Sequence, residues 1–479
     1  MRLEDPMRRK SKLITVAIGV VAITGGGLLV ASEGGAVLRV ATGSVSRSLC
    51  SAAFVSNVDP GRVFREEQVP EGGMSYVAWA LRYDINRTKR EVRATIAGAF
   101  ASRAAYRNGL GCLLVADSSA IPEARGLAET SSRPTTETLP VAYSHDARIA
   151  RAIERAFEDP APNKQRNTKA VVAFHDGRLI AEKYAPGYGP DTPIWGHSLS
   201  KSLTSALVGV LVREGRLSVG QPAPIAAWQQ PGDLRAAITP DQLLRMTSGL
   251  PFDERGGPVN HMTRMFFLEP DTAAYSESVP LDATPGTAWG YSNLGYQLLS
   301  RMVRDAAGGS GVEAEAYIRE QLFAPLKMHT AVIETDVAGT PIGASHVYAS
   351  ARDWAKLGQL YLDDGVANGH RILPDGWVEY TTKQSLDTGY GAGFWLNVKN
   401  DGVVPYWDAP WGMPQLPKDM FYARGYLGQF IVIVPSRRLV VVRMGMTHLG
   451  VGTGVGDLVA EILRSLPPTV PDQPASNQS

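Results

Sequence analysis

The segment Ser198-Leu-Ser-Lys201 opens the longest strongly apolar helical run of the chain, Leu199-Ser-Lys-Ser-Leu-Thr-Ser-Ala-Leu-Val-Gly-Val-Leu-Val212. Residues three apart on a helix lie on one face, so the Ser198 hydroxyl and the Lys201 amine are predicted to touch. The positive end of the helix dipole there favours a developing oxyanion. Apolar neighbours lower the pKa of a lysine, and its neutral form can take the serine proton. The segment predicts an activated serine nucleophile.

The composition is that of an ordinary globular protein. The chain has 479 residues, 44% hydrophobic and 20% charged, with a formal net charge of +1. No basic stripe stands out, which argues against nucleic acid as the main partner. We find no Gly-rich phosphate loop, and the eight histidines show no metal-binding spacing. We therefore expect no metal, no cofactor and a small-molecule substrate.

Residues 14–31 carry no charge and follow a basic cluster at Arg8, Arg9, Lys10 and Lys12. As a helix, this run would be about 27 Å long, close to the thickness of one bilayer core. We favour a membrane anchor whose N-terminal flank is cytoplasmic. A cleaved signal ending near Ser32 is the alternative, because three consecutive glycines weaken the helix. Both interpretations predict an exported, periplasmic main body.

Composition shifts divide the chain into five parts. Residues 1–33 are the cytoplasmic stub and anchor or signal, 34–117 a small exported unit, 118–144 a Ser-, Thr- and Pro-rich linker, 145–465 the main domain and 466–479 a disordered tail. The only cysteines, Cys50 and Cys112, lie in the exported unit. In an oxidising compartment we expect a disulfide between them, with two buried free thiols as the alternative.

Two hairpins frame the main domain. Ala170–His175 and Leu179–Tyr184 flank an Asp-Gly turn, and Gln429–Val434 and Leu439–Met444 form a second pair near the other end. The region between them is mostly helical, with a capping box at 239–242. This pattern predicts an α+β fold, in which an antiparallel sheet flanked by helices joins an all-helical lobe.

Two further motifs follow the serine. Tyr291-Ser-Asn293 places a phenol, suited to proton relay, beside a carboxamide that can hold a substrate carbonyl. Tyr106-Arg-Asn108 has the same bare pattern but precedes the serine and is interpreted as structural. In Ala423-Arg424-Gly425-Tyr426, the glycine permits close backbone approach. The amide of Tyr426 could then complete an oxyanion hole with that of Ser198.

Together these motifs resemble the serine β-lactamase and penicillin-binding-protein family, with its order Ser-x-x-Lys, Tyr-x-Asn, Lys-Thr-Gly. The likeness is greatest to the branch of class C enzymes, related esterases and 6-aminohexanoate-dimer hydrolase, whose Leu-Leu-x-x-Thr-Ser-Gly-Leu segment is matched at 243–250. It covers about 145–465. The resemblance implies that Ser198 is acylated, Lys201 is its base, Tyr291 serves the leaving group and Asn293 orients the substrate.

One departure bears on the substrate. Where the family has Lys-Thr-Gly, this chain has Ala423-Arg424-Gly425. The family lysine and threonine usually engage the carboxylate of a β-lactam or peptide. Arg424 is the candidate for supplying a charge to the substrate there, although it occupies the middle position and neighbouring strand residues point to opposite faces. A small neutral amide or ester therefore fits better, cleaved by an amidase or carboxylesterase. The alternative function is a penicillin-binding sensor or D-amino-acid peptidase of the same fold.

Several residues near the motifs have a simpler interpretation. Gly196-His-Ser-Leu-Ser200 nearly spells an α/β-hydrolase elbow but lacks the final glycine and the parallel βα pattern. His197 is expected to pack rather than react. Asp253 and Glu254 are interpreted as an exposed carboxylate pair, with a place lining the cleft as the alternative. Trp395 is interpreted as core, with a place in the cleft wall as the alternative.

Overall fold

The computed structural model describes residues 33–70, 73–116, 119–121, 142–144, 146–162, 164–254, 257–398, 403–404, 409–410 and 412–467. The predicted anchor at 14–31, most of the linker and the tail from 468 lie outside the described residues. Within the described part, no helix is both long and apolar enough to cross a membrane.

The largest sheet of the described residues is antiparallel and has six strands in the order β12-β15-β16-β17-β5-β6. These are β12 (Trp395–Leu396), β15 (Phe421–Gly425), β16 (Gln429–Val434), β17 (Leu439–Gly445), β5 (Thr168–His175) and β6 (Arg178–Tyr184). The two hairpins meet where β17 pairs with β5, with Leu439 opposite His175. The prediction that strands from both ends of the domain share one sheet is confirmed.

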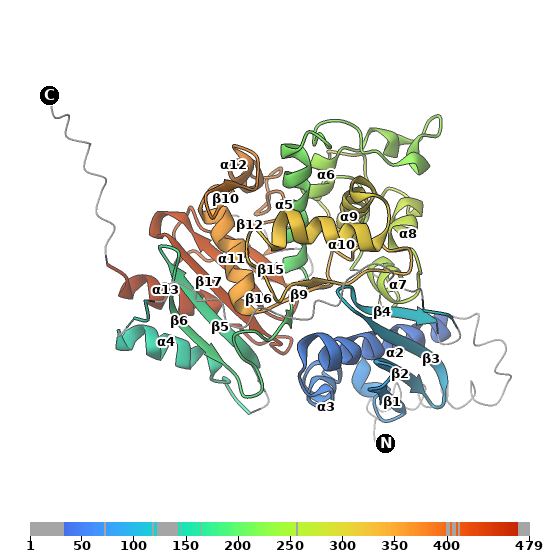
Figure 1. Ribbon diagram of the computed structural model, residues 1–479, viewed down its shortest axis with the longest axis horizontal. Helices are drawn as coiled ribbons and strands as arrows, with labels where there is room; N and C mark the ends of the chain where they lie inside the picture. Colours follow the sequence, from blue (N-terminus) through green and yellow to red (C-terminus); the bar gives the residue numbers. More distant parts are fainter. Residues whose placement is uncertain are drawn as a thin grey trace, which may run out of the picture.

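Helices cover both faces of this sheet, which explains why β5, β16 and β17 are almost wholly buried. Helix α11 (Ala351–Leu362) packs on β16, β17 and β5. Helices α4 (Ala147–Phe157) and α13 (Val455–Ser465) pack on one another at the other side (Figure 1).

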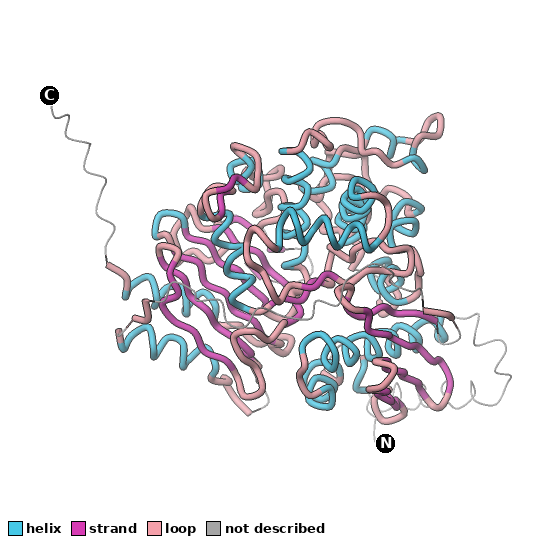
Figure 2. Tube along the Cα trace, in the orientation of Figure 1, coloured by secondary structure: helices cyan, strands magenta, loops and turns pink. Residues whose placement is uncertain are grey.

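The middle of the chain forms a helical lobe beside the sheet, and Figure 2 shows the strands of the sheet and the helices of this lobe in two adjoining regions. Its helices are α5 (Leu199–Arg213), α6 (Pro240–Leu244), α7 (His261–Phe267), α8 (Thr272–Ser278), α9 (Asn293–Ala307) and α10 (Gly311–Ile318). The predicted capping box at Thr239 and Gln242 begins α6. Helix α5 contacts both α9 and β15, and every residue from Leu199 to Leu211 is buried. Its apolar run is therefore that of a central helix.

Residues 33–116 fold into helix α2 (Glu33–Ser51) packed on a sheet. The strands, in spatial order, are β1 (Leu81–Asn86), β2 (Glu91–Ile96), β3 (Ala99–Arg107) and β4 (Gly111–Ala116). Of these four strands, the sequence indicates only β4, whose segment Cys112–Val115 is a continuous apolar run. The other strands are harder to recognise because the outward face of β1 and β2 is charged. A disulfide joins Cys50, at the end of α2, to Cys112 in β4.

This N-terminal unit packs against a small three-stranded sheet, whose first strand leads directly into the Ser198 turn. That sheet pairs β7 (Ile194–Trp195) with β9 (Val347–Ala349) and β9 with β8 (Val332–Ile333). Tyr348 of β9 belongs to the same buried cluster as the core of the unit, and Trp195 packs against it. The unit thus supports the strand that leads directly into Gly196-His197-Ser198.

A buried carboxylate fastens this contact. Glu334 is fully buried and accepts hydrogen bonds from Arg47 Nε at 2.9 Å, Ser51 Oγ at 2.6 Å and the Cys112 amide at 2.9 Å. Because a buried ion is costly unless paired and hydrogen-bonded, this network ties the two parts of the chain specifically.

Candidate active site

Ser198 and Lys201 are brought together as their spacing predicts. Ser198 is the N-cap residue of α5, and Lys201 lies one turn along the helix. Lys201 Nζ is 2.9 Å from Ser198 Oγ, a hydrogen-bond distance. The hydroxyl and the amine are therefore placed for direct proton transfer.

The surroundings of Lys201 orient its amine. Nζ lies 2.6 Å from Asn293 Oδ1 and 2.8 Å from the carbonyl oxygen of Ala344. A neutral amine has two hydrogens and one lone pair. If the two carbonyl oxygens accept both hydrogens, the lone pair faces Ser198 Oγ. Burial lowers the pKa of Lys201 to about 8, against the opposing attraction of Glu254 and Asp253, so the neutral form is accessible near neutral pH.

Tyr291 is close to both Ser198 and Lys201. Its ring centroid is 4.9 Å from Lys201 Nζ, and its hydroxyl shares a hydrogen bond with that of Ser198. The residue is buried, and burial raises the pKa of its phenol well above the usual value. Tyr291 thus carries its proton at neutral pH and can donate it.

Asn293 opens α9 and points its amide away from solvent. Its oxygen receives the contact from Lys201, while Nδ2 donates to Asp253 Oδ1 and to Glu254 Oε1, both at 3.0 Å. Both amide hydrogens are therefore used within the protein. The resemblance implied a substrate-orienting role, whereas this geometry assigns the amide of Asn293 to Lys201.

The expectation that Asp253 and Glu254 form an exposed pair is wrong. Asp253 is fully buried, and Glu254 is partly buried. Asp253 Oδ2 also accepts the Leu294 amide at 2.9 Å, at the first turn of α9, where the helix dipole favours a negative charge. In the sequence, the position of this pair just after the 243–250 segment was the available sign that it belongs to the site. Its burial could not be predicted, because it depends on how α9 packs against the loop.

The end of β15 reaches the serine turn. A Cβ built on Gly425 would lie 2.3 Å from the carbonyl oxygen of Gly196, so only glycine permits this approach. Tyr426 follows, with its ring centroid 5.9 Å from that of His197. The structure thus brings Gly425 and Tyr426 beside the turn that holds Ser198.

His197 itself packs, as expected. Its ring stacks on Trp195 with centroids 3.8 Å apart, and burial lowers its pKa to about 3. The imidazole is therefore uncharged at neutral pH, and its contact with Trp195 is a packing contact.

The sequence profile of the family described as Beta-lactamase matches residues 150–451, well over half of the chain. The chain belongs to the beta-lactamase family. The N-terminal unit lies outside the match. The match over residues 150–451 confirms the resemblance inferred from the motifs, and the fold agrees with that family.

This chain is similar to known proteins with several different names. It is 28% identical over 224 residues to the 6-aminohexanoate-dimer hydrolase of Paenarthrobacter ureafaciens, covering 44% of this chain and 56% of that one. The chain therefore spans little more than half of that relative. Two solved structures each give a TM-score of 0.51: a penicillin-binding-protein homologue from Caulobacter crescentus, 18% identical, and EstA from Arthrobacter nitroguajacolicus Rue61a, 15% identical. The alignments cover 68% and 69% of this chain and 99% of each neighbour. At these identities, they show the fold.

Arg424 stands within the third motif of this beta-lactamase-family site. Its guanidinium lies 6.0 Å from the Phe430 ring centroid and close enough to Glu254 to interact with its charge. Burial lowers the pKa of Arg424, yet an arginine remains charged at neutral pH. The middle position of the motif thus carries a cation, while the position of the family lysine holds Ala423.

Aromatic rings pack around Tyr291. Trp395 stacks on it with centroids 5.8 Å apart, Tyr390 meets it edge-on at 6.3 Å, and Trp289 lies at 6.3 Å. Trp395 is core, as expected, with 2% of its surface exposed. Sequence analysis missed Tyr390, which lies in a loop without motif context.

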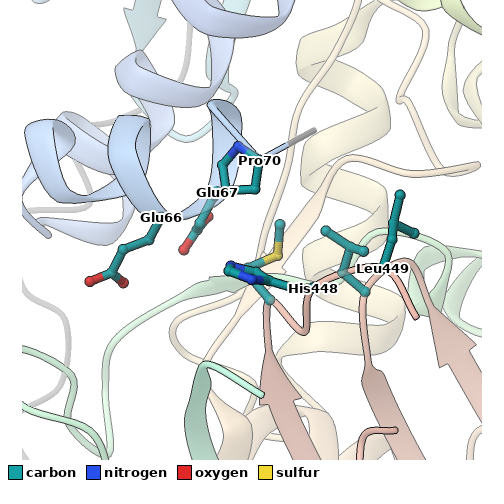
Figure 3. A pocket seen from close by; sticks show the side chains of 7 residues that line it. Glu66, Glu67, Pro70, His448 and Leu449 are labelled. Carbon is teal, nitrogen blue, oxygen red and sulfur yellow. The ribbon is translucent and has the colours of Figure 1, made fainter. Parts of the chain in front are cut away.

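The N-terminal unit also meets the main domain near the end of β15. A cavity of about 230 Å³ opens there (Figure 3), lined by Glu66, Glu67, Pro70, Leu427, Met446, His448 and Leu449. Leu427 directly follows Tyr426. Residues 66–70 of the N-terminal unit, which lie outside the family match, therefore form one wall of this cavity. The cavity lies next to the turn that carries Tyr426, whose amide is the expected oxyanion donor.

Proposed function

We propose that this protein is a serine hydrolase that forms an acyl-enzyme on Ser198 and cleaves a small amide or ester. The observation that carries the proposal is the 2.9 Å contact between Ser198 Oγ and a buried lysine amine held by two carbonyl oxygens. A serine N-cap without catalytic work would not require a lysine of lowered pKa beside it.

In the first step, the Ser198 Oγ–H proton moves to Lys201 Nζ as Oγ attacks the substrate carbonyl carbon. The carbonyl π electrons move to oxygen, and the amides of Ser198 and Tyr426 are proposed to bind that oxyanion. The positive end of α5 adds to this stabilisation.

In the second step, the tetrahedral intermediate collapses and the bond to the leaving group breaks. Tyr291 donates its phenolic proton to the departing nitrogen or oxygen and is reprotonated from Lys201, which returns the amine to its neutral form. Water then attacks the acyl-enzyme by the reverse sequence and releases the acid and free Ser198.

The proposed substrate class is an uncharged acyl compound with an apolar chain, linear aminohexanoate oligomers included. Of the rings around Tyr291, Trp395 and Tyr390 are buried, whereas Trp289 is partly exposed and offers apolar surface near the nucleophile. A relative is named 6-aminohexanoate-dimer hydrolase, and one structural neighbour is a family VIII carboxylesterase. The presence of Ala423 and Arg424 in place of the family lysine and threonine supports a substrate other than a β-lactam.

The proposal is tested by intact-protein mass spectrometry during p-nitrophenyl butyrate turnover. We expect a transient butyryl adduct, and peptide mapping should place it on Ser198. A long-lived adduct without turnover would favour the alternative, a penicillin-binding sensor. Turnover with the adduct on another residue would contradict the assignment.

We further propose that the main domain is exported, by an anchor or signal at 14–31. The disulfide between Cys50 and Cys112 supports this, because disulfides persist in oxidising compartments. Alkylation of the denatured, unreduced protein, taken directly from its source cells, should modify neither cysteine. Two modified thiols would contradict export.

A further inference from the structure

The carboxylates of Asp253 and Glu254 lie behind the base, on the far side of Asn293 from Lys201. Each accepts one hydrogen bond from Asn293 Nδ2, at 3.0 Å. Lys201 Nζ lies 2.6 Å from the opposite end of the same amide. The two carboxylates therefore contact the NH₂ end of the Asn293 carboxamide, and the amine of Lys201 contacts its oxygen end.

This arrangement fixes which way the amide points. If the carboxamide turned over, its NH₂ group would meet the amine of Lys201, and its oxygen would meet two carboxylates. The oxygen would be repelled by the ionised carboxylates, and the NH₂ group would offer no acceptor to the amine hydrogens of Lys201. The carboxylates therefore keep the Asn293 oxygen on Lys201, where it accepts an amine hydrogen and leaves the lone pair facing Ser198 Oγ.

We propose that Glu254 is a positioning residue for Lys201, which acts through Asn293 to orient the amine and whose negative charge sets the pH at which the base becomes neutral. This inference rests on the proposed function. It gives a role in the reaction to the 253–254 loop, which belongs to none of the three family motifs.

The sign of the charge effect follows from the groups around Lys201. Asp253 and Glu254 attract the ammonium and oppose the burial that lowers its pKa. The rings of Tyr291 and Tyr296 and the neutral His197 also face the amine, and Arg424 faces Glu254. Burial raises the pKa of both carboxylates, that of Asp253 to about 7, so Asp253 is fully charged only above that pH. Where Glu254 is ionised, removing its charge lowers the pKa of Lys201, and the base becomes active at lower pH.

The test compares kcat/KM against pH for the full chain and Glu254→Gln, with p-nitrophenyl butyrate and the Ser198→Ala rate subtracted as background. Wild-type activity should rise as pH increases through about 8. In Glu254→Gln, whose side-chain oxygen can still accept from Asn293, we expect this rise about one pH unit lower, with KM within about twofold. Glu379→Gln, which changes an exposed carboxylate of α12 (Trp377–Thr382), is the charge-matched control.

Glu254→Asp provides a second variant, which keeps the charge but shortens the side chain. Its acid limb should stay near that of the wild type, while kcat falls about tenfold because the amide is held less firmly. An unshifted limb in a folded Glu254→Gln, or a change in KM alone, would overturn the inference. If instead Ser198→Ala retained turnover, the proposed function itself would fail.

Discussion

Replacing Ser198 with alanine is expected to lower kcat for p-nitrophenyl butyrate about a thousandfold or more. The substitution removes the hydroxyl oxygen that lies 2.9 Å from Lys201 Nζ and is the proposed acylated nucleophile. Substrate binding should change little, because the loss is one of chemistry. Initial rates of p-nitrophenol release, with circular dichroism to verify the fold, measure the effect.

The matched control is Ser278→Ala. Ser278 ends α8 and is exposed, and its hydroxyl donates only to the nearby Tyr275 carbonyl oxygen. This variant should retain wild-type kcat. A Ser198→Ala rate within tenfold of the wild type would show that another group performs the hydrolysis.

Replacing Glu334 with alanine is expected to lower the free energy of unfolding by about 3–5 kcal/mol. The change leaves the Arg47 guanidinium, 3% exposed, without its counter-charge, and leaves Ser51 Oγ and the Cys112 amide without their acceptor. The N-terminal unit would then separate more readily from the sheet that leads to Ser198. Urea unfolding followed by circular dichroism measures the change.

A double variant separates the buried charge from the packing. Arg47→Leu with Glu334→Leu should lose less stability than either single change, because no unpaired ion remains buried. If Glu334→Ala were as stable as the exposed control Glu379→Gln, the network would not fasten the unit to the main domain.

Local patterns predicted much of the fold correctly. The Asp176-Gly177 turn placed one hairpin, and the apolar run after Ser198 placed the central helix. The strands β1–β3 were missed because charged residues such as Arg82 and Arg93 alternate along them, so their apolar positions are few. Only pairing with neighbours and packing under α2 stabilise them as a sheet.

The sequence by itself determined the contact between Ser198 and Lys201, because a three-residue spacing on a helix brings two side chains together wherever that helix lies. The tertiary structure alone decided how the amine is oriented and charged. Asn293, Ala344 and the 253–254 loop come from distant parts of the chain, yet all interact with Lys201, the first two by hydrogen bonds and the loop through its charges. A pKa depends on burial and on charges that are near in space, and a local pattern does not contain those distances.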